Sequence, residues 1–135
     1  MADKKTTYIE GIGRRKTATA RVRLTPAAKT EITVNGKEYK DYFGNLALQK
    51  DIESVLATED AGIETYTITA KVLGGGISSQ AEAIRLGIAR ALVKEKADRR
   101  TQLKAAGYLM RDPRSVERKK PGLRKARKRP AWSKR

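Results

Sequence analysis

Residues 65–92 read TYTITAKVLGGGISSQAEAIRLGIARAL, a strand pattern followed by three glycines and a helix pattern. From Thr65 to Leu73 apolar and polar residues alternate, which is typical of a strand with one buried face. From about Ser78 to Ala97 the spacing becomes that of an amphipathic helix, and Ser78 and Ser79 are its predicted N-cap residues. The predicted buried stripe of this helix comprises Ile77, Ala81, Ile84, Ile88 and Leu92. The stretch therefore predicts helices packed on a sheet, an α+β arrangement.

Further elements are predicted on both sides of this stretch. The expected strands are residues 8–13, 17–24 and 31–34, and the expected helices are residues 42–58 and 98–106. Asn35-Gly36 is a strong signal for a type I′ turn that leads into residues 37–39. Tyr39, Tyr42 and Phe43 stand before or at the start of the first helix, and we interpret them as core residues, with base stacking as the alternative.

The chain ends in a strongly basic segment. Residues 118–135 read RKKPGLRKARKRPAWSKR, in which ten of eighteen residues are Lys or Arg and none is acidic. The few apolar side chains offset too little of the cost of ordering this backbone, and Pro121, Gly122 and Pro130 interrupt any long helix. We predict a globular body over residues 1–110 and an extended tail over residues 111–135 that binds nucleic acid, with a merely solvated end as the alternative.

The net charge of +16 is unevenly distributed. Residues 111–135 hold 12 basic and 2 acidic residues, hence +10, whereas residues 25–84 hold 5 basic and 9 acidic residues, hence −4. In the body, positive charge gathers in the Arg14-Arg15-Lys16 turn and in Arg21 and Arg23, which share one face of the second strand. We interpret these cations as phosphate contacts, with an ordinary solvated strand face as the alternative. The asymmetry predicts a polyanionic partner.

Composition and motifs argue against catalysis. The chain has no Cys and no His, which removes disulfides, thiolate nucleophiles and the usual zinc ligands. Residues 74–79, GGGISS, lack the Lys of a Walker loop, and Ser79 stands where the dinucleotide fingerprint needs its last glycine. We interpret this loop as a tight turn that lets an RNA backbone approach, with an enzyme acting on nucleotides as a remote alternative. No apolar run approaches the length of a membrane span, so we expect no membrane partner. We also expect no cofactor, no metal and no small-molecule substrate.

Four stretches together resemble the family of the ninth protein of the bacterial small ribosomal subunit. They are GIGRRKTATARVRL at residues 11–24, LGGGISSQAEAIRLGIARAL at residues 73–92, RDPRSVERKKPGLRKAR at residues 111–127 and SKR at residues 133–135. Their order matches the family over nearly the whole chain. The departures are Ser79, where the family usually has Gly, and Trp132, where Phe is more usual.

The resemblance implies both a fold and a place of assembly. It implies an α+β domain with a mainly four-stranded sheet, helices on one side and a left-handed β-α-β crossover, although the general rule favours the right hand. It also implies assembly into the head of the small subunit beside other head proteins, with the tail threading through ribosomal RNA. The tail tip, formed by Ser133, Lys134 and Arg135, is implied to reach the anticodon stem-loop of transfer RNA in the peptidyl site.

We therefore predict a structural ribosomal protein of the cytoplasm that is not an enzyme. Its predicted contacts to ribosomal RNA are Arg14, Arg15, Lys16, Arg21, Arg23, Lys71, Arg85, Arg90, Arg111, Arg114, Arg118, Lys119, Lys120, Arg124, Lys125, Arg127, Lys128 and Arg129. Composition alone allows a DNA-binding architectural protein equally well, and this is the alternative. Duplex DNA would then compete with structured RNA for the protein.

Overall fold

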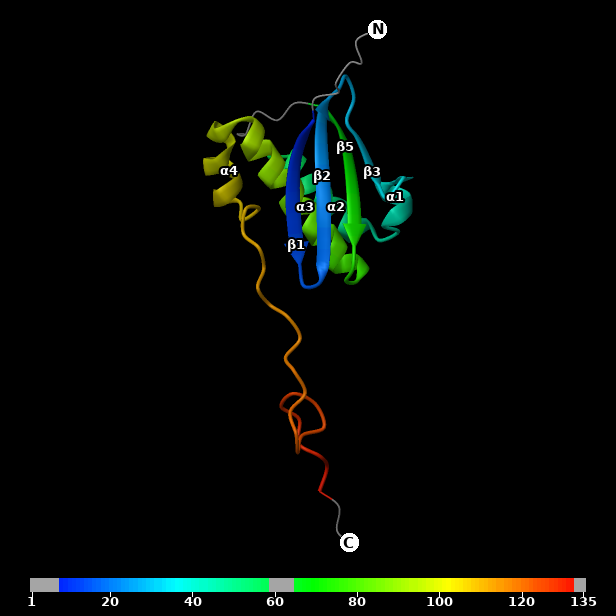
Figure 1. Cartoon of the computed structure of the whole chain (residues 1–135), viewed down its shortest axis with the longest axis vertical. Helices are drawn as coiled ribbons and strands as arrows, with labels where there is room; N and C mark the ends of the chain where they lie inside the picture. Colours follow the sequence, from blue (N-terminus) through cyan, green and yellow to red (C-terminus); the bar gives the residue numbers. More distant parts are fainter. Residues whose placement is uncertain (1–7, 59–64, 133–135) are drawn as a thin grey trace.

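The computed structural model describes residues 8–58 and 65–132, which form one mixed sheet, several helices and a long C-terminal tail (Figure 1). The strands are β1 (Ile9–Arg15), β2 (Ala18–Pro26), β3 (Glu31–Val34), β4 (Lys37–Glu38) and β5 (Tyr66–Leu73). The helices are α1 (Tyr39–Tyr42), α2 (Leu46–Leu56), α3 (Ile77–Glu95) and α4 (Arg100–Ala105), with the 3₁₀ turn η2 (Ala97–Arg99) before α4. The predicted α+β class is thus confirmed.

The strands form a single sheet in the order β1-β2-β5-β3-β4. Neighbouring strands are antiparallel except for β3 and β5, which are parallel. The chain therefore crosses from β3 to β5 through α1 and α2, as a β-α-β unit. The turn between β3 and β4 has φ values of 50° at Asn35 and 83° at Gly36, so both residues are left-handed, as the predicted type I′ turn requires.

The mainly four-stranded sheet implied by the family resemblance is corrected to five strands. The additional strand is β4, whose two residues pair with the last two residues of β3. Its physical cause is the tight turn at Asn35 and Gly36, which folds the chain directly back on β3. The two residues that follow the turn therefore pair with β3 and add a short strand to the sheet.

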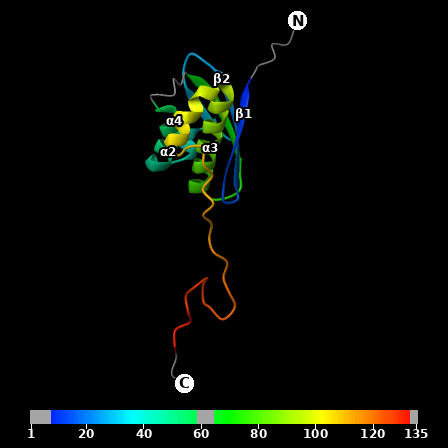
Figure 2. The ribbon, with the colours of Figure 1, turned by 90° about the vertical axis from the view of Figure 1, so that its left-hand side faces the viewer.

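The hydrophobic core lies between the sheet and the helices α2, α3 and α4, which are on one side of it (Figure 2). Every second residue of β2 and β5 is buried, as the alternation predicts. The predicted stripe of α3 is buried at Ala81, Ile84, Ile88 and Leu92. Ile77 is the exception at 57% exposed, because it is the first residue of α3 and follows directly on the exposed glycine turn.

The aromatic residues around α1 fill the edge of this core. Phe43 is fully buried, and its ring meets the ring of Tyr42 edge-on with 4.8 Å between the centroids. The half-buried Tyr39 donates its hydroxyl hydrogen to Glu53 of α2, and Tyr42 donates to Gln80 of α3 at 2.7 Å. These contacts confirm the interpretation of the three aromatic residues as core residues.

Two helix boundaries differ from the sequence prediction. The N-cap residue of α3 is Gly76, and no side chain caps the helix, so Ser78 and Ser79 are not cap residues. Ser79 is instead buried within the first turn of α3. The helix predicted over residues 42–58 begins later, as α2 at Leu46, since the side chain of Asn45 accepts a backbone N–H from two residues further on and caps this helix; Tyr42 instead ends the separate short helix α1.

Glycines allow α3 to lie directly on β1. A Cβ atom on Gly13 would lie 1.7 Å from the carbonyl oxygen of Ala83, and one on Gly11 would lie 2.2 Å from the carbonyl oxygen of Gly87. No side chain fits at such distances, so the strand and the helix touch through their backbones. This close contact fixes α3 beside β1 and thereby sets the positions of the cations on both elements.

The tail leaves the body after α4 and Gly107, whose φ of 85° turns the chain. Residues 111–132 contain neither helix nor strand and extend away from the sheet (Figures 1 and 2). One loop interrupts this path, where the N–H of Arg124 donates to the carbonyl oxygen of Lys128 at 2.8 Å. Gly122, two residues before this loop begins, has a φ of 79°.

Candidate nucleic-acid interface

The outward side of the sheet forms a cationic sheet face, defined by the exposed residues Arg14, Arg21, Arg23 and Lys71. The strand register places Arg21 directly opposite Lys71. The guanidinium of Arg23 lies 4.4 Å from the centroid of the Tyr8 ring, and the Nε of Arg21 lies 3.9 Å from a carboxylate oxygen of Glu10. An exposed ion pair of this length contributes little to stability, so the cations of this face remain available to a polyanion.

A second group of cations lies where α3 passes β1. Arg90 is exposed and donates from Nη1 to the carbonyl oxygen of Ile12 at 2.8 Å. The guanidinium of the half-buried Arg85 lies 5.8 Å from the centroid of the Tyr108 ring. A narrow cleft beside these residues is lined by four of the predicted site residues, namely Arg14, Arg15, Arg85 and Arg111. The fold thus gathers cations from β1, from α3 and from the start of the tail.

Arg15 is turned into the body, unlike its neighbours. Only 11% of its side chain is exposed, and its Nε donates to Oε2 of Glu82 at 2.5 Å. Its Nη1 donates to the carbonyl oxygens of Asp112, at 3.3 Å, and of Arg114. One guanidinium therefore joins β1, α3 and residues 111–116, a segment that we name the tail root. A contact of Arg15 with RNA stays a prediction.

Asp112 is the acidic centre of the tail root. Its carboxylate accepts from Nη2 of Arg114 at 2.7 Å and lies 3.4 Å from Nη1 of Arg15. The hydrogen bonds from Arg114 hold the pKa of Asp112 well below its usual range. Arg111 adds a bond from Nη2 to the carbonyl oxygen of Lys16 at 3.4 Å. The tail root is therefore tied to the β1–β2 turn, and its one carboxylate is offset by two guanidinium groups.

Further along the tail, Glu117 brings two cations together. Its carboxylate accepts from Nζ of Lys120 and from Nε of Arg127, the latter at 2.9 Å. The other predicted contacts in this part of the tail are exposed, namely Arg118, Lys119, Arg124, Lys125, Lys128 and Arg129. Ser133, Lys134 and Arg135 lie outside the described residues.

The sequence prediction missed the acidic residues that organise these cations. For Asp112 and Glu117 a local signal existed, since their partners Arg114 and Lys120 stand only two and three residues further along the chain. Glu82 gave no such signal, because its partner lies 67 residues away in the sequence. The prediction therefore identified cations on the surface without the residues that orient them.

The glycine turn before α3 packs against the β1–β2 turn. Gly74 and Gly75 have φ values of 77° and 65°. A Cβ atom on Gly74 would lie 2.6 Å from the carbonyl oxygen of Thr17, and one on Gly75 would lie 2.9 Å from the Cβ of Ala18. These glycines thus serve close packing within the protein, and an approach of RNA to this turn stays a prediction.

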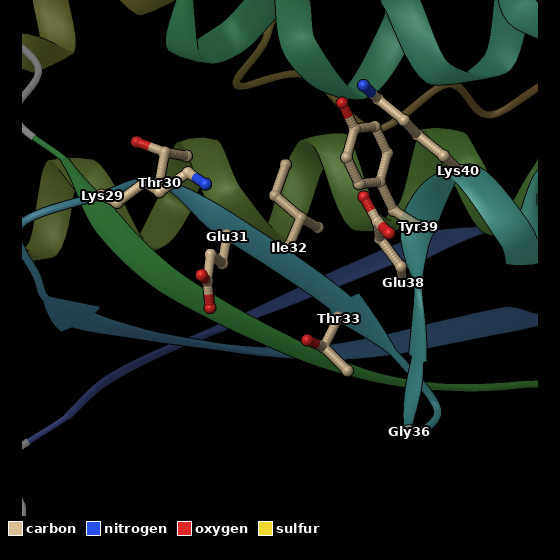
Figure 3. A pocket seen from close by; sticks show the side chains of 9 residues that line it. All are labelled: Lys29, Thr30, Glu31, Ile32, Thr33, Gly36, Glu38, Tyr39 and Lys40. Atoms are coloured by element: carbon tan, nitrogen blue, oxygen red, sulfur yellow. The ribbon is translucent and has the colours of Figure 1, made fainter.

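The opposite edge of the sheet differs in charge. A hollow of about 590 Å³ beside β3, β4 and α1 is lined by the cations Lys29 and Lys40 and by the acids Glu31 and Glu38, together with uncharged residues (Figure 3). These charges offset one another, in agreement with the acidic balance of residues 25–84. This edge therefore offers a polyanion no excess of positive charge.

Within residues 8–58 and 65–132, no group of three or more His, Cys, Asp or Glu residues is arranged to hold a metal ion. No helix of this described part is both long and apolar enough to cross a membrane.

Known proteins are similar to this chain over most of its length. Residues 13–135 match the family model described as ribosomal protein S9/S16. A small ribosomal subunit protein uS9 of Mycobacterium tuberculosis is 50% identical over 127 residues, which cover 94% of this chain and 83% of that protein. The uS9 protein of Nocardia farcinica is 48% identical over 94% of this chain and 75% of its own length. Because these matches extend from the sheet through the basic tail, the chain belongs to the ribosomal protein S9/S16 family.

Proposed function

We propose that this protein is a structural constituent of the head of the small ribosomal subunit and binds ribosomal RNA. The observation that carries the proposal is the group of exposed cations on β1, β2, β5 and α3 together with those along the tail. Arg14 of the cationic sheet face, Arg85 of α3 and Arg111 of the tail root line one cleft, whereas the hollow beside β3 and β4 has balanced charge. The similar proteins of Mycobacterium tuberculosis and Nocardia farcinica are small ribosomal subunit proteins, which supports the same partner.

The mechanism is electrostatic. Lys and Arg side chains neutralise phosphates and release counterions, while an Arg guanidinium also forks two donors onto phosphate oxygens. The tail contributes most of the charge and becomes ordered where RNA segments converge around it. The tail root fixes the direction in which the tail starts, because Arg15 binds two of its carbonyl groups.

The resemblance to the family supplies further parts of the same proposal, namely the contact of the tail tip, the neighbours of the body and the hand of the crossover. The tail tip, formed by Ser133, Lys134 and Arg135, reaches the anticodon stem-loop of transfer RNA in the peptidyl site. Neighbouring proteins of the head pack on the body, the crossover from β3 to β5 is left-handed, and the protein works in the cytoplasm as part of the ribosome.

Two triple variants of equal charge test the binding of RNA. The first replaces Arg14, Arg21 and Lys71 of the cationic sheet face with Gln. The control replaces Lys29, Lys37 and Lys40, near the opposite edge of the sheet, with Gln. Affinity for transcribed small-subunit ribosomal RNA is measured by filter binding over a range of salt.

The first variant should lower the slope of log affinity against log salt by roughly 2 to 3, since three phosphate contacts are lost, and the control should leave it nearly unchanged. Equal slopes for the two variants would contradict the assignment of the interface. Effective competition by duplex DNA would favour the DNA-binding alternative.

A further inference from the structure

The β1–β2 turn and the tail root enclose a second concave surface beside the cationic sheet face. It has a volume of about 450 Å³ and is lined by Lys16, Thr17 and the six residues of the tail root. We name it the root groove. A neighbouring hollow of about 330 Å³ shares Lys16, Arg114, Ser115 and Val116 with it and adds Arg15. The volume falls within the range of about 300–1,000 Å³ that is usual for small-ligand sites.

Both walls of the root groove are held in place by bonds within the protein. Arg15 binds the carbonyl groups of Asp112 and Arg114 and is itself held by Glu82. Arg111 donates to the carbonyl oxygen of Lys16 from across the groove. The groove therefore has its shape before a partner arrives, which lowers the entropic cost of binding.

The charges of the root groove suit an anion. The exposed cations Lys16, Arg111 and Arg114 line it. Its one carboxylate, on Asp112, is bonded to Arg114 and lies 3.4 Å from Arg15, so it adds little net negative charge. A phosphate group at the rim of the groove would meet an excess of guanidinium and ammonium groups.

The same groove has an apolar surface that an anion alone does not explain. Val116 lines it and is 86% exposed, and the exposed Pro113 lines it as well. An exposed aliphatic surface surrounded by cations suits a ligand with a flat apolar face and an attached phosphate. A nucleotide has both, but a base within a duplex keeps its faces in the stack, so only an unpaired base can offer one.

We propose that the root groove binds one unpaired ribonucleotide, with its base against Pro113 and Val116 and its phosphates at Lys16, Arg111 and Arg114. The hydroxyl-bearing residues Thr17 and Ser115 line the same groove and supply partners for a ribose 2′-hydroxyl. The inference rests on the proposed binding of ribosomal RNA and specifies which form of RNA this part of the protein recognises.

Substitutions that leave the charge unchanged test the base contact. Val116→Ser should weaken binding to transcribed small-subunit ribosomal RNA about three- to tenfold, because the apolar contact is lost. The salt dependence of binding should stay unchanged, because no phosphate contact is removed. Val116→Leu should restore affinity close to that of the natural chain. Leu46→Ser, at a 62% exposed position that starts α2, is the control and should have no effect.

Cross-linking identifies the occupant. The chain has no Cys, so Val116→Cys provides a single thiol for a photoactivatable group in reconstituted small subunits. We expect one discrete cross-link to an unpaired nucleotide, and none to that nucleotide from the control Met110→Cys.

Three outcomes would overturn the proposal: cross-links to paired nucleotides, cross-links only to another protein, or full affinity of Val116→Ser. Failure of the natural chain itself to bind ribosomal RNA would refute the proposed function instead, which keeps the two tests distinct.

Discussion

Arg14 and Arg15 are adjacent residues of one type, and the fold gives their side chains different surroundings. Arg14 is exposed on the cationic sheet face. Arg15 is bonded to Glu82 and to two carbonyl groups of the tail root. A guanidinium has five N–H donors in a fixed planar fork, so a single Arg can join three segments in a way that Lys cannot.

The substitution Arg15→Ala should lower the free energy of unfolding by about 1–3 kcal/mol, because the carboxylate of Glu82 and the carbonyls of the tail root lose a shared donor. Arg14→Ala is the matched control and should change it by less than about 0.5 kcal/mol. Urea denaturation of the full chain measures both effects. Equal stability of the two variants would refute the structural role of Arg15.

The types of residue at the site were predictable, whereas their partners were not. Runs of Lys and Arg and the alternation along β2 predicted which cations face outward. The bonds of Arg15, however, join residues 67 and 97 positions apart. Local patterns in one sequence contain no information on such distant contacts. The burial of Arg99 was missed as well: it is only 2% exposed and donates to Glu95, four residues before it, at 3.0 Å, although Arg is usually a surface residue.

For the helices and strands, apolar periodicity predicted where they lie, and backbone bonding decided where they begin. The side chain of Asn45 caps α2, so the predicted helix begins at Leu46 and not at Tyr42. The start of α3 has no capping side chain, so the two serines that suggested an N-cap were misleading. The fifth strand depends on a two-residue turn whose signal was visible, but the length of the pairing that follows was not. The backbone contact between β1 and α3 also had only an indirect signal, the glycines of β1.

That backbone contact gives a test at Gly13. In Gly13→Ala the new methyl group would lie 1.7 Å from the carbonyl oxygen of Ala83, so α3 must move away from β1. The free energy of unfolding should fall by at least about 1–3 kcal/mol, as in other overpacked interiors. Gly44→Ala is the control, because nothing lies within 4 Å of its added methyl group. A variant at Gly13 as stable as this control in thermal denaturation would contradict the packing.

The hydrogen bond from Tyr39 of α1 to Glu53 of α2 predicts that the stability of the fold depends on pH. Burial and the hydrogen bond to Glu53 raise the pKa of Tyr39 to about 12. Since the folded-state pKa exceeds the unfolded value of about 10, this stabilisation is complete below about pH 10 and is lost as the pH rises towards 12. The difference in stability between the natural chain and Tyr39→Phe should therefore shrink over this range. Parallel stability curves in urea titrations from pH 9 to about 12 would disprove the effect.

Over the whole molecule, the two sides of the sheet differ both in charge and in their distance from the tail. The tail starts on the side of the sheet where β1 lies, and β3 lies towards the opposite side (Figure 1). The hollow with balanced charge is lined by residues of β3, β4 and α1. Ten Lys and Arg residues follow Glu117 in the tail. Beyond the tail root, the described tail has few bonds other than those of its own loop, so the proposed function expects RNA to supply its order.

Removal of residues 117–135 tests the tail as an RNA anchor. If about five of its ten cations meet phosphates, the slope of log affinity against log salt should fall by roughly 3.5 to 4.5. The body and the tail root should keep their stability, because Arg15 and its partners remain. Filter binding with transcribed small-subunit ribosomal RNA measures the slope. An unchanged slope would mean that the tail does not lie along the RNA backbone.

Removal of only residues 133–135 separates anchoring from contact with transfer RNA. The deletion takes away Lys134 and Arg135 and leaves the other eight cations of the segment that follows Glu117, so the protein should still assemble into small subunits. Transfer RNA in the peptidyl site should bind less firmly by about 1–3 kcal/mol, because two charge-assisted contacts to its phosphates are lost, and by less where solvent screens them. Filter binding of transfer RNA to subunits reconstituted with either chain gives the difference. Equal affinity at every salt concentration would show that the tip does not touch transfer RNA and that the tail only anchors the protein to ribosomal RNA.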